Sequence, residues 1–122
     1  MRFQPLSHTT LPTDQLMADF SASRAVGKVR LGQEQLYFTK FSGTAYLPYS
    51  EIVRAYLRQE EVTAKMCCGR ANFDRFFVMA QGQDGTLHKL EVPTRQAADQ
   101  ALAHIAARNP NTEIGYRKPQ PA

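Results

Sequence analysis

The chain has 122 residues, which is the length of one domain and too short for two separate hydrophobic cores. Its apolar fraction of 43% is ordinary for a globular protein and excludes a disordered chain. No apolar run approaches the roughly 20 residues that span a bilayer. No hydrophobic segment follows the first residues as it would in a signal peptide. We therefore expect a cytoplasmic protein.

The formal net charge of +4 comes from 15 basic and 11 acidic residues that are spread along the chain without any run of Lys and Arg. Nucleic-acid-binding surfaces need clustered basic charge. We therefore expect no nucleic-acid partner.

The only two cysteines, Cys67 and Cys68, are neighbours. A disulfide between adjacent residues needs a strained ring, and the three histidines show no zinc-ligand spacing. We predict two reduced thiols at a strand end or turn, with no metal and no cofactor. A redox or thiol-dependent enzymatic role for this pair is the minority alternative.

The N-terminal segment, residues 1–24, is predicted to be an irregular arm that contains one short helix. The helix is expected at 13–20, with Thr13 or Asp14 as its N-cap. From residue 26 the apolar period changes to two, which is typical of strands that lie half-buried.

Short strands follow one another too closely for crossover helices, so their pairing should be antiparallel. The expected strands cover 26–31, 35–41, 44–49, 75–80 and 86–92. Pro48 marks a strand end, and the Asp84-Gly85 pair predicts the hairpin between the last two strands.

Residues 52–62 are ambiguous. As a strand, the stretch places Arg54, Tyr56 and Arg58 on one face. The opposite face then carries Val53, Ala55 and Leu57. As a helix, the same stretch has an apolar stripe at 3.6 spacing. The surrounding strands favour the strand and leave the helix open.

The end of the chain should hold one helix at 95–108, capped by Thr94 and stopped at Asn109. The tail, residues 110–122, contains a short extended piece at 113–117. This piece can fill a sheet edge, either within the chain or between two chains.

Three segments resemble one family: Gly27–Gly32, Leu36-Tyr37-Phe38 and Leu47-Pro48-Tyr49-Ser50-Glu51-Ile52. Together with the hairpin and the final helix, they resemble small bacterial domains of the pleckstrin-homology superfold over residues 25–109. The resemblance implies a mostly β (α+β) fold, a bent antiparallel sheet or partly open barrel of about seven strands capped by the C-terminal helix. Members bind lipid headgroups, peptides or proteins and rarely carry catalytic residues.

Two candidate sites follow. Arg54, Tyr56 and Arg58 are of residue types enriched at protein interfaces, which predicts a protein or peptide partner or a second copy of the chain. Lys28, Arg30 and Lys40 are the candidates for an anionic ligand, as in headgroup-binding members. The loop at 32–35 lacks Lys and Arg, which argues against a phosphate clamp there.

Enzymatic chemistry finds little support, because no phosphate loop or paired carboxylate is present. Glu60 and Glu61 are adjacent and would point to opposite faces of a strand. The sequence therefore predicts a non-catalytic protein-interaction or scaffolding module, with a peripheral membrane module as the alternative.

Overall fold

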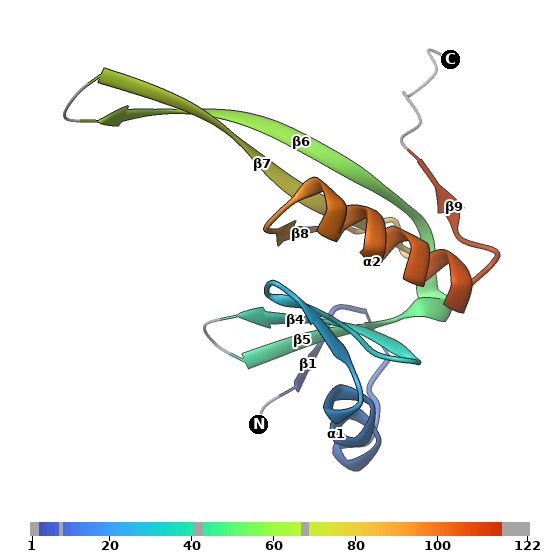
Figure 1. Ribbon diagram of the computed structural model, residues 1–122. Helices are drawn as coiled ribbons and strands as arrows, with labels where there is room; N and C mark the ends of the chain where they lie inside the picture. The colour runs from blue at the N-terminus through green and yellow to red at the C-terminus, as the bar shows by residue number, and fades with distance from the viewer. Residues whose placement is uncertain (1–2, 8, 41–42, 67–68, 116–122) are drawn as a thin grey trace.

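The computed structural model of the chain describes residues 3–7, 9–40, 43–66 and 69–115. Within these residues the fold is mostly β, with nine strands in two mixed sheets and two α-helices (Figure 1). The strands are β1 (Phe3–Pro5), β2 (Arg24–Val26), β3 (Val29–Leu31), β4 (Gln35–Lys40), β5 (Gly43–Pro48), β6 (Ile52–Met66), β7 (Gly69–Gly82), β8 (Leu87–Val92) and β9 (Glu113–Ile114). The helices are α1 (Thr13–Ser21) and α2 (Arg95–Arg108), and a 3-10 turn, η1 (Tyr49–Glu51), follows β5.

The five-stranded sheet has the order β1-β5-β4-β3-β2. The single strand expected at 26–31 is wrong, because β2 and β3 form a hairpin that turns at Gly27 and Lys28. Gly27 has a φ of 67°, a conformation that glycine adopts without steric cost. A glycine at the first central position is what a two-residue type II′ hairpin needs.

The N-terminal segment packs against this sheet. β1 pairs in parallel with β5, and α1 covers the sheet face that carries Tyr37 and Tyr46. The predicted cap of α1 is wrong: Thr13 is already helical, and the extended residue before the helix is Pro12, whose carbonyl accepts from the Leu16 N–H.

The four-stranded sheet has the order β8-β7-β6-β9. Its longest strand, β6, confirms the strand reading of residues 52–62. One detail was wrong: Val53 lies at a bulge and is 42% exposed instead of facing the core with Ala55. A bulge adds one unpaired residue and resets which side chains face inward.

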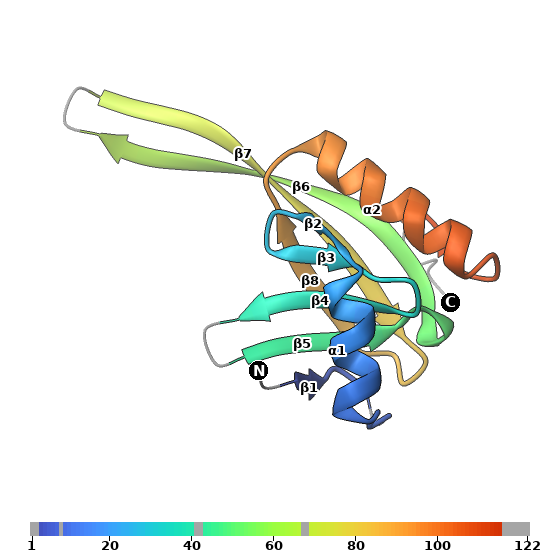
Figure 2. The ribbon, with the colours of Figure 1, turned by 60° about the horizontal axis from the view of Figure 1, so that its bottom comes forward.

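The Asp84-Gly85 hairpin between β7 and β8 and the Thr94 cap of α2 are both confirmed. The Thr94 hydroxyl accepts from the Ala97 N–H at 3.0 Å. α2 lies on the face of the four-stranded sheet that is turned toward the other sheet (Figures 1 and 2). Its Ala98, Ala101 and Ile105 are fully buried. The main core therefore lies between the two sheets and α2.

Within the tail, Glu113–Ile114 form β9, which pairs in parallel with β6 of the same chain at Arg54 and Ala55. Residues 116 and 117 of the expected extended piece lie outside the described residues. The expectation of purely antiparallel sheets is therefore wrong at both short edge strands, β1 and β9. Neither sheet closes into a barrel, and the described residues hold nine strands where about seven were expected.

The turn between β3 and β4 is held from two sides. The Asp19 carboxylate of α1 accepts from the backbone N–H groups of Gln33 at 2.8 Å and Gln35 at 3.2 Å, and from the Glu34 N–H between them. It also accepts from the Tyr37 hydroxyl at 2.8 Å. A Cβ at Gly32 would come within 2.2 Å of this carboxylate and within 2.8 Å of the Gln35 backbone carbonyl oxygen, so a larger residue would displace both.

The carbonyls of the same turn accept from the other side. Gly32 accepts from the Tyr49 hydroxyl at 2.9 Å and from His104 Nε2 at 2.7 Å. Because a carbonyl only accepts, Nε2 of His104 carries the proton. The Gln33 carbonyl accepts from Arg108 Nε at 2.7 Å. This turn therefore joins α1 to α2.

Removing the Asp19 carboxylate should destabilise the fold. The Asp19→Ala variant removes the acceptor of three backbone N–H groups and leaves the Tyr37 hydroxyl only its longer bonds to the Leu16 carbonyl and to Gln35, so we expect a loss of about 2 kcal/mol in the free energy of unfolding. Asp14→Ala, an exposed carboxylate on the same helix, is the control and should cost about 0.5 kcal/mol. Urea denaturation measures both, and equal losses would contradict the role of Asp19.

Stability should also fall at alkaline pH. Burial raises the pKa of both Tyr37 and Tyr49 above the ordinary value of 10.0. The hydrogen bond to Asp19 raises the pKa of Tyr37 further. The unfolded chain ionises these phenols first, so their contribution is complete below pH 10 and is lost as the pH rises above it. Tyr37→Phe removes one such group, and its unfolding free energy should decline less steeply between about pH 9.5 and 11. Equal slopes for variant and wild type would contradict this assignment.

Candidate functional site

The candidate site is the outer face of the four-stranded sheet, defined as the face turned away from α2. Ala55, Val78 and Leu90 face the core, so alternation places their neighbours on this outer face. The pairing puts Tyr56 beside Met79 and Arg58 beside Phe77. β6 thus presents Arg54, Tyr56 and Arg58 on one face, the arrangement expected of a strand.

Charged side chains cover the apolar centre of this face. Phe77 is only 4% exposed although it points away from the core, because Lys89 and Arg75 lie over its ring at 4.2 and 5.3 Å from the centroid. Long cationic side chains shield apolar surface in this way while their charges stay hydrated.

Carboxylates connect these cations. Glu60 accepts from Arg58 at 2.8 Å and from Lys89 at 2.6 Å, while Glu91 pairs with Arg75 at 2.7 Å. The hydrogen bond from Lys89 lowers the pKa of Glu60, and the one from Arg75 lowers the pKa of Glu91. The face therefore carries an ordered pattern of both signs of charge and not a uniform basic patch.

Arg54 has a different role from Arg58. Its guanidinium donates to the Glu113 carboxylate of β9 at 2.8 Å, and its Nε is buried without a hydrogen-bond partner among the described residues. Arg54 therefore helps to fasten β9 to β6, whereas Arg58 lies in the exposed part of the face.

Within the part of the chain that the structure describes, the edge of β6 beyond β9 is open. β9 covers only Arg54 and Ala55, and within the described residues no strand pairs with the edge of β6 from residue 57 to residue 62, which we call the open edge. A hollow of about 450 Å³ is lined by the consecutive residues Tyr56, Leu57, Arg58 and Gln59. Side chains from both faces of one strand line it, so it runs along that edge.

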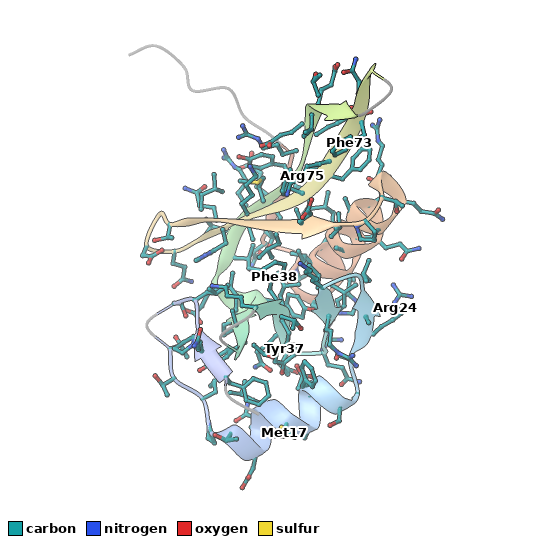
Figure 3. All side chains as sticks on the ribbon, turned by 90° about the vertical axis from the view of Figure 1, so that its left-hand side faces the viewer. Met17, Arg24, Tyr37, Phe38, Phe73 and Arg75 are labelled. Atoms are coloured by element: carbon teal, nitrogen blue, oxygen red, sulfur yellow. The ribbon has the colours of Figure 1, made fainter. Side chains whose placement is uncertain are left out.

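The open edge belongs to a hairpin that leaves the body of the molecule. Figure 1 shows β6 and β7 extending together well past β8 and α2. Toward the far end, Phe73 is 48% exposed and lies opposite Val62, while Arg75 is closer to the body (Figure 3). An exposed strand edge on a projecting hairpin is accessible to another chain.

The three candidates for an anionic ligand are not gathered into one clamp. Arg30 already contacts α1 and the residues that follow it. Its guanidinium donates to the Ser23 hydroxyl at 2.7 Å and to the Ser23 carbonyl at 3.0 Å. It also lies 4.6 Å from the centre of the Phe20 ring. Lys28 and Lys40 lie at the same end of the β3–β4 hairpin, where the Lys28 carbonyl accepts from the Thr39 N–H. Lys28 also lines a hollow of about 230 Å³ that contains Asp74 and Glu91.

The backbone of the 32–35 loop offers no alternative. Its N–H groups, which are the natural donors to a phosphate, are already bound to the Asp19 carboxylate. An anion of the chain itself therefore occupies the position that a headgroup would need.

The sequence did not single out the cross-strand partners of Arg58. Phe77, Met79 and Lys89 come from strands that were predicted, but their place beside Arg58 and Tyr56 depends on the register of β6, β7 and β8. One signal was available: Phe76 to Ala80 is continuously apolar, which is typical of a strand covered on both faces.

Other candidate chemistry is sparse. His104 is bound to Gly32, and burial lowers the pKa of His88. Cys67 and Cys68, the candidates for thiol chemistry, lie outside the described residues. Among the residues that are described, no three metal-binding side chains come together, and no helix is long and apolar enough to cross a membrane.

In the described residues, these features define a small β-rich domain of two sheets and two helices with an open edge along β6. The chain belongs to the family described as Domain of unknown function (DUF6709), whose model matches residues 3–120. No curated protein and no solved structure matches the chain.

Anionic vesicles should not retain the protein. Arg30 is held by Ser23 and Lys28 is beside Glu91, so charge complementarity to headgroups is low. We expect no sedimentation with phosphatidylserine vesicles at low salt, with neutral vesicles as the control. Binding that falls with salt and is lost in Lys28→Glu would contradict this prediction.

Proposed function

We propose that this chain is a non-catalytic protein-interaction module that binds a partner strand at the open edge of β6. The observation that supports this proposal is that no described strand pairs with the edge of β6 from residue 57 to residue 62, which lies beside a face of paired charges. Unpaired N–H and C=O groups along a strand edge are a template for adding a strand of another chain.

The residues around the edge fit such a partner. Backbone hydrogen bonds give affinity in strand addition, and side chains beside the edge give specificity. Arg58 and Tyr56 supply the residue types that dominate interface energies. The hollow beside them has room for side chains of an added strand.

The resemblance to the pleckstrin-homology superfold supports the same proposal. β2 to β5 precede β6 to β8, and α2 follows them, which is the order that this superfold would have. In this interpretation β1, α1 and β9 are additions at the ends of the chain. The resemblance implies a domain that binds lipid headgroups, peptides or proteins and rarely carries catalytic residues, and the low charge complementarity to headgroups leaves peptides and proteins as its ligands.

A photo-crosslinker placed beside the edge tests the proposal. Replacing Gln59, which is exposed on β6, by p-benzoyl-phenylalanine should yield a defined crosslinked product when cells producing the protein are irradiated. Gln100, exposed on α2, is the control position and should yield none. Adding Arg58→Glu should remove the product made at position 59, because the partner meets that side chain.

Two results would contradict the proposal. One is the absence of any crosslinked chain at position 59. The other is a set of products that is the same at positions 59 and 100 and insensitive to Arg58→Glu.

A further inference from the structure

We infer that the strand that occupies the open edge is β6 of a second copy of this chain, paired antiparallel about a twofold axis at Gln59. This inference rests on the proposed function and names its partner. A twofold interface uses the same surface of both copies, so the edge must be complementary to itself. The backbone pattern, the charges and the limits of the edge each bear on this requirement.

The backbone groups of β6 point in the directions that this pairing requires. The Ala55 carbonyl accepts from the Gly115 N–H at 2.9 Å, so Ala55 points its polar groups toward the edge where β9 lies. Alternation along the strand then turns the N–H and C=O groups of Leu57, Gln59 and Glu61 outward as well. In an antiparallel pair centred on Gln59, Leu57 of each copy exchanges hydrogen bonds with Glu61 of the other.

The charges select this register. With the axis at Gln59, Arg58 of each copy lies opposite Glu60 of the other, on the same face, so two pairs of opposite charge form. Cross-strand neighbours of opposite sign stabilise a sheet and like charges destabilise it. Glu60 is already shared by Arg58 and Lys89 of its own chain, and the second copy's Arg58 joins this cluster.

The neighbouring registers fail for electrostatic or steric reasons. An axis at Arg58 sets the two Arg58 side chains against each other, and an axis at Glu60 or Glu61 does the same for two carboxylates. An axis at Leu57 brings Gln59 of the second copy to Ala55, where β9 already holds the edge, and so leaves only Leu57 itself free to pair on the open edge. Gln59 is therefore the centre that leaves both sheets and both charge pairs intact.

β9 also sets the length of the contact. The ladder can extend from Leu57 to Glu61 in each chain, because Gly115, which follows β9 and donates to the Ala55 carbonyl, lies beside Tyr56. Val62 of the second copy would meet Gly115, so the second hairpin must leave the ladder after Glu61. A contact this short buries little surface, and we expect a weak, concentration-dependent dimer.

Mixing two charge-reversed variants tests the pairing. Arg58→Glu alone places carboxylates opposite carboxylates, and Glu60→Arg alone places guanidinium groups together, so each should weaken dimerisation by about tenfold or more. In an equimolar mixture, the carboxylate introduced in the first variant faces the guanidinium introduced in the second. The native Glu60 of the first variant then faces the native Arg58 of the second. Sedimentation velocity should therefore show dimers restored in the mixture.

Only contact between two copies predicts this rescue, since damage to either chain's own fold would persist in the mixture. Gln59→Pro provides a second variant, because it removes the outward N–H at the axis while leaving the β6–β7 ladder bonds in place. It should abolish the dimer with little change in melting temperature. Arg95→Glu, at an exposed position in the first turn of α2, is the charge-matched control and should dimerise like wild type.

Wild-type protein that stays monomeric at about 1 mM overturns the inference, as does a mixture that remains as monomeric as its components. The proposed function is tested separately by the crosslinker at position 59. A product with a different protein there, together with monomeric pure protein, would reject the second copy and leave strand addition standing. No product at all would reject both.

Discussion

The fold depends on the turn at residues 32–35, where β3 leads into β4 and hydrogen bonds from two helices meet. Asp19 satisfies its N–H groups from one side, and Tyr49, His104 and Arg108 satisfy its carbonyls from the other. Gly32 and Gln35 of this turn are buried, and a buried backbone group left without a partner costs more than a made bond contributes. Because the partners come from α1, η1 and α2, the two sheets cannot shift relative to each other without leaving some of these groups unpaired.

Hydrogen bonds from the end of α2 and the residues after it also fix the start of β6, and with it the position of the candidate site. Asn109, at the end of α2, donates to the Tyr49 carbonyl at 2.6 Å, and Thr112 donates to the Ile52 carbonyl at 2.7 Å. These bonds fix where β6 begins and bring the chain back beside it as β9. The ion pair between Arg54 and Glu113 then holds β9 in place. The open edge starts where this fastening ends, so its position is set by the core and not by the hairpin itself.

The sequence predicted the features that local chemistry determines. The Asp84-Gly85 turn, the Thr94 cap and the alternation of Arg54, Tyr56 and Arg58 all require only neighbouring residues. It did not predict features that depend on distant partners. The bulge at Val53 changes which side faces inward, the Gly27 turn divides an apparently continuous strand, and the capture of Arg30 by Ser23 requires α1 to fold beneath β3. Asp19 looked like an ordinary helix residue, because its hydrogen-bond partners lie more than ten positions away.

An open strand edge is a hazard unless its pairing is restricted, and charged side chains are one means of restriction. On β6, Arg58 and Glu60 lie two residues apart on one face, and Glu61 follows on the other. Most strands that could add to this edge would place a like charge or an apolar side chain against one of these groups. A strand with the opposite order of charges would not, and an antiparallel copy of β6 has that order. In the proposed dimer, the charges that would exclude other strands are therefore the ones that would select the second copy, and the fastening of β9 would limit the registers that it can adopt.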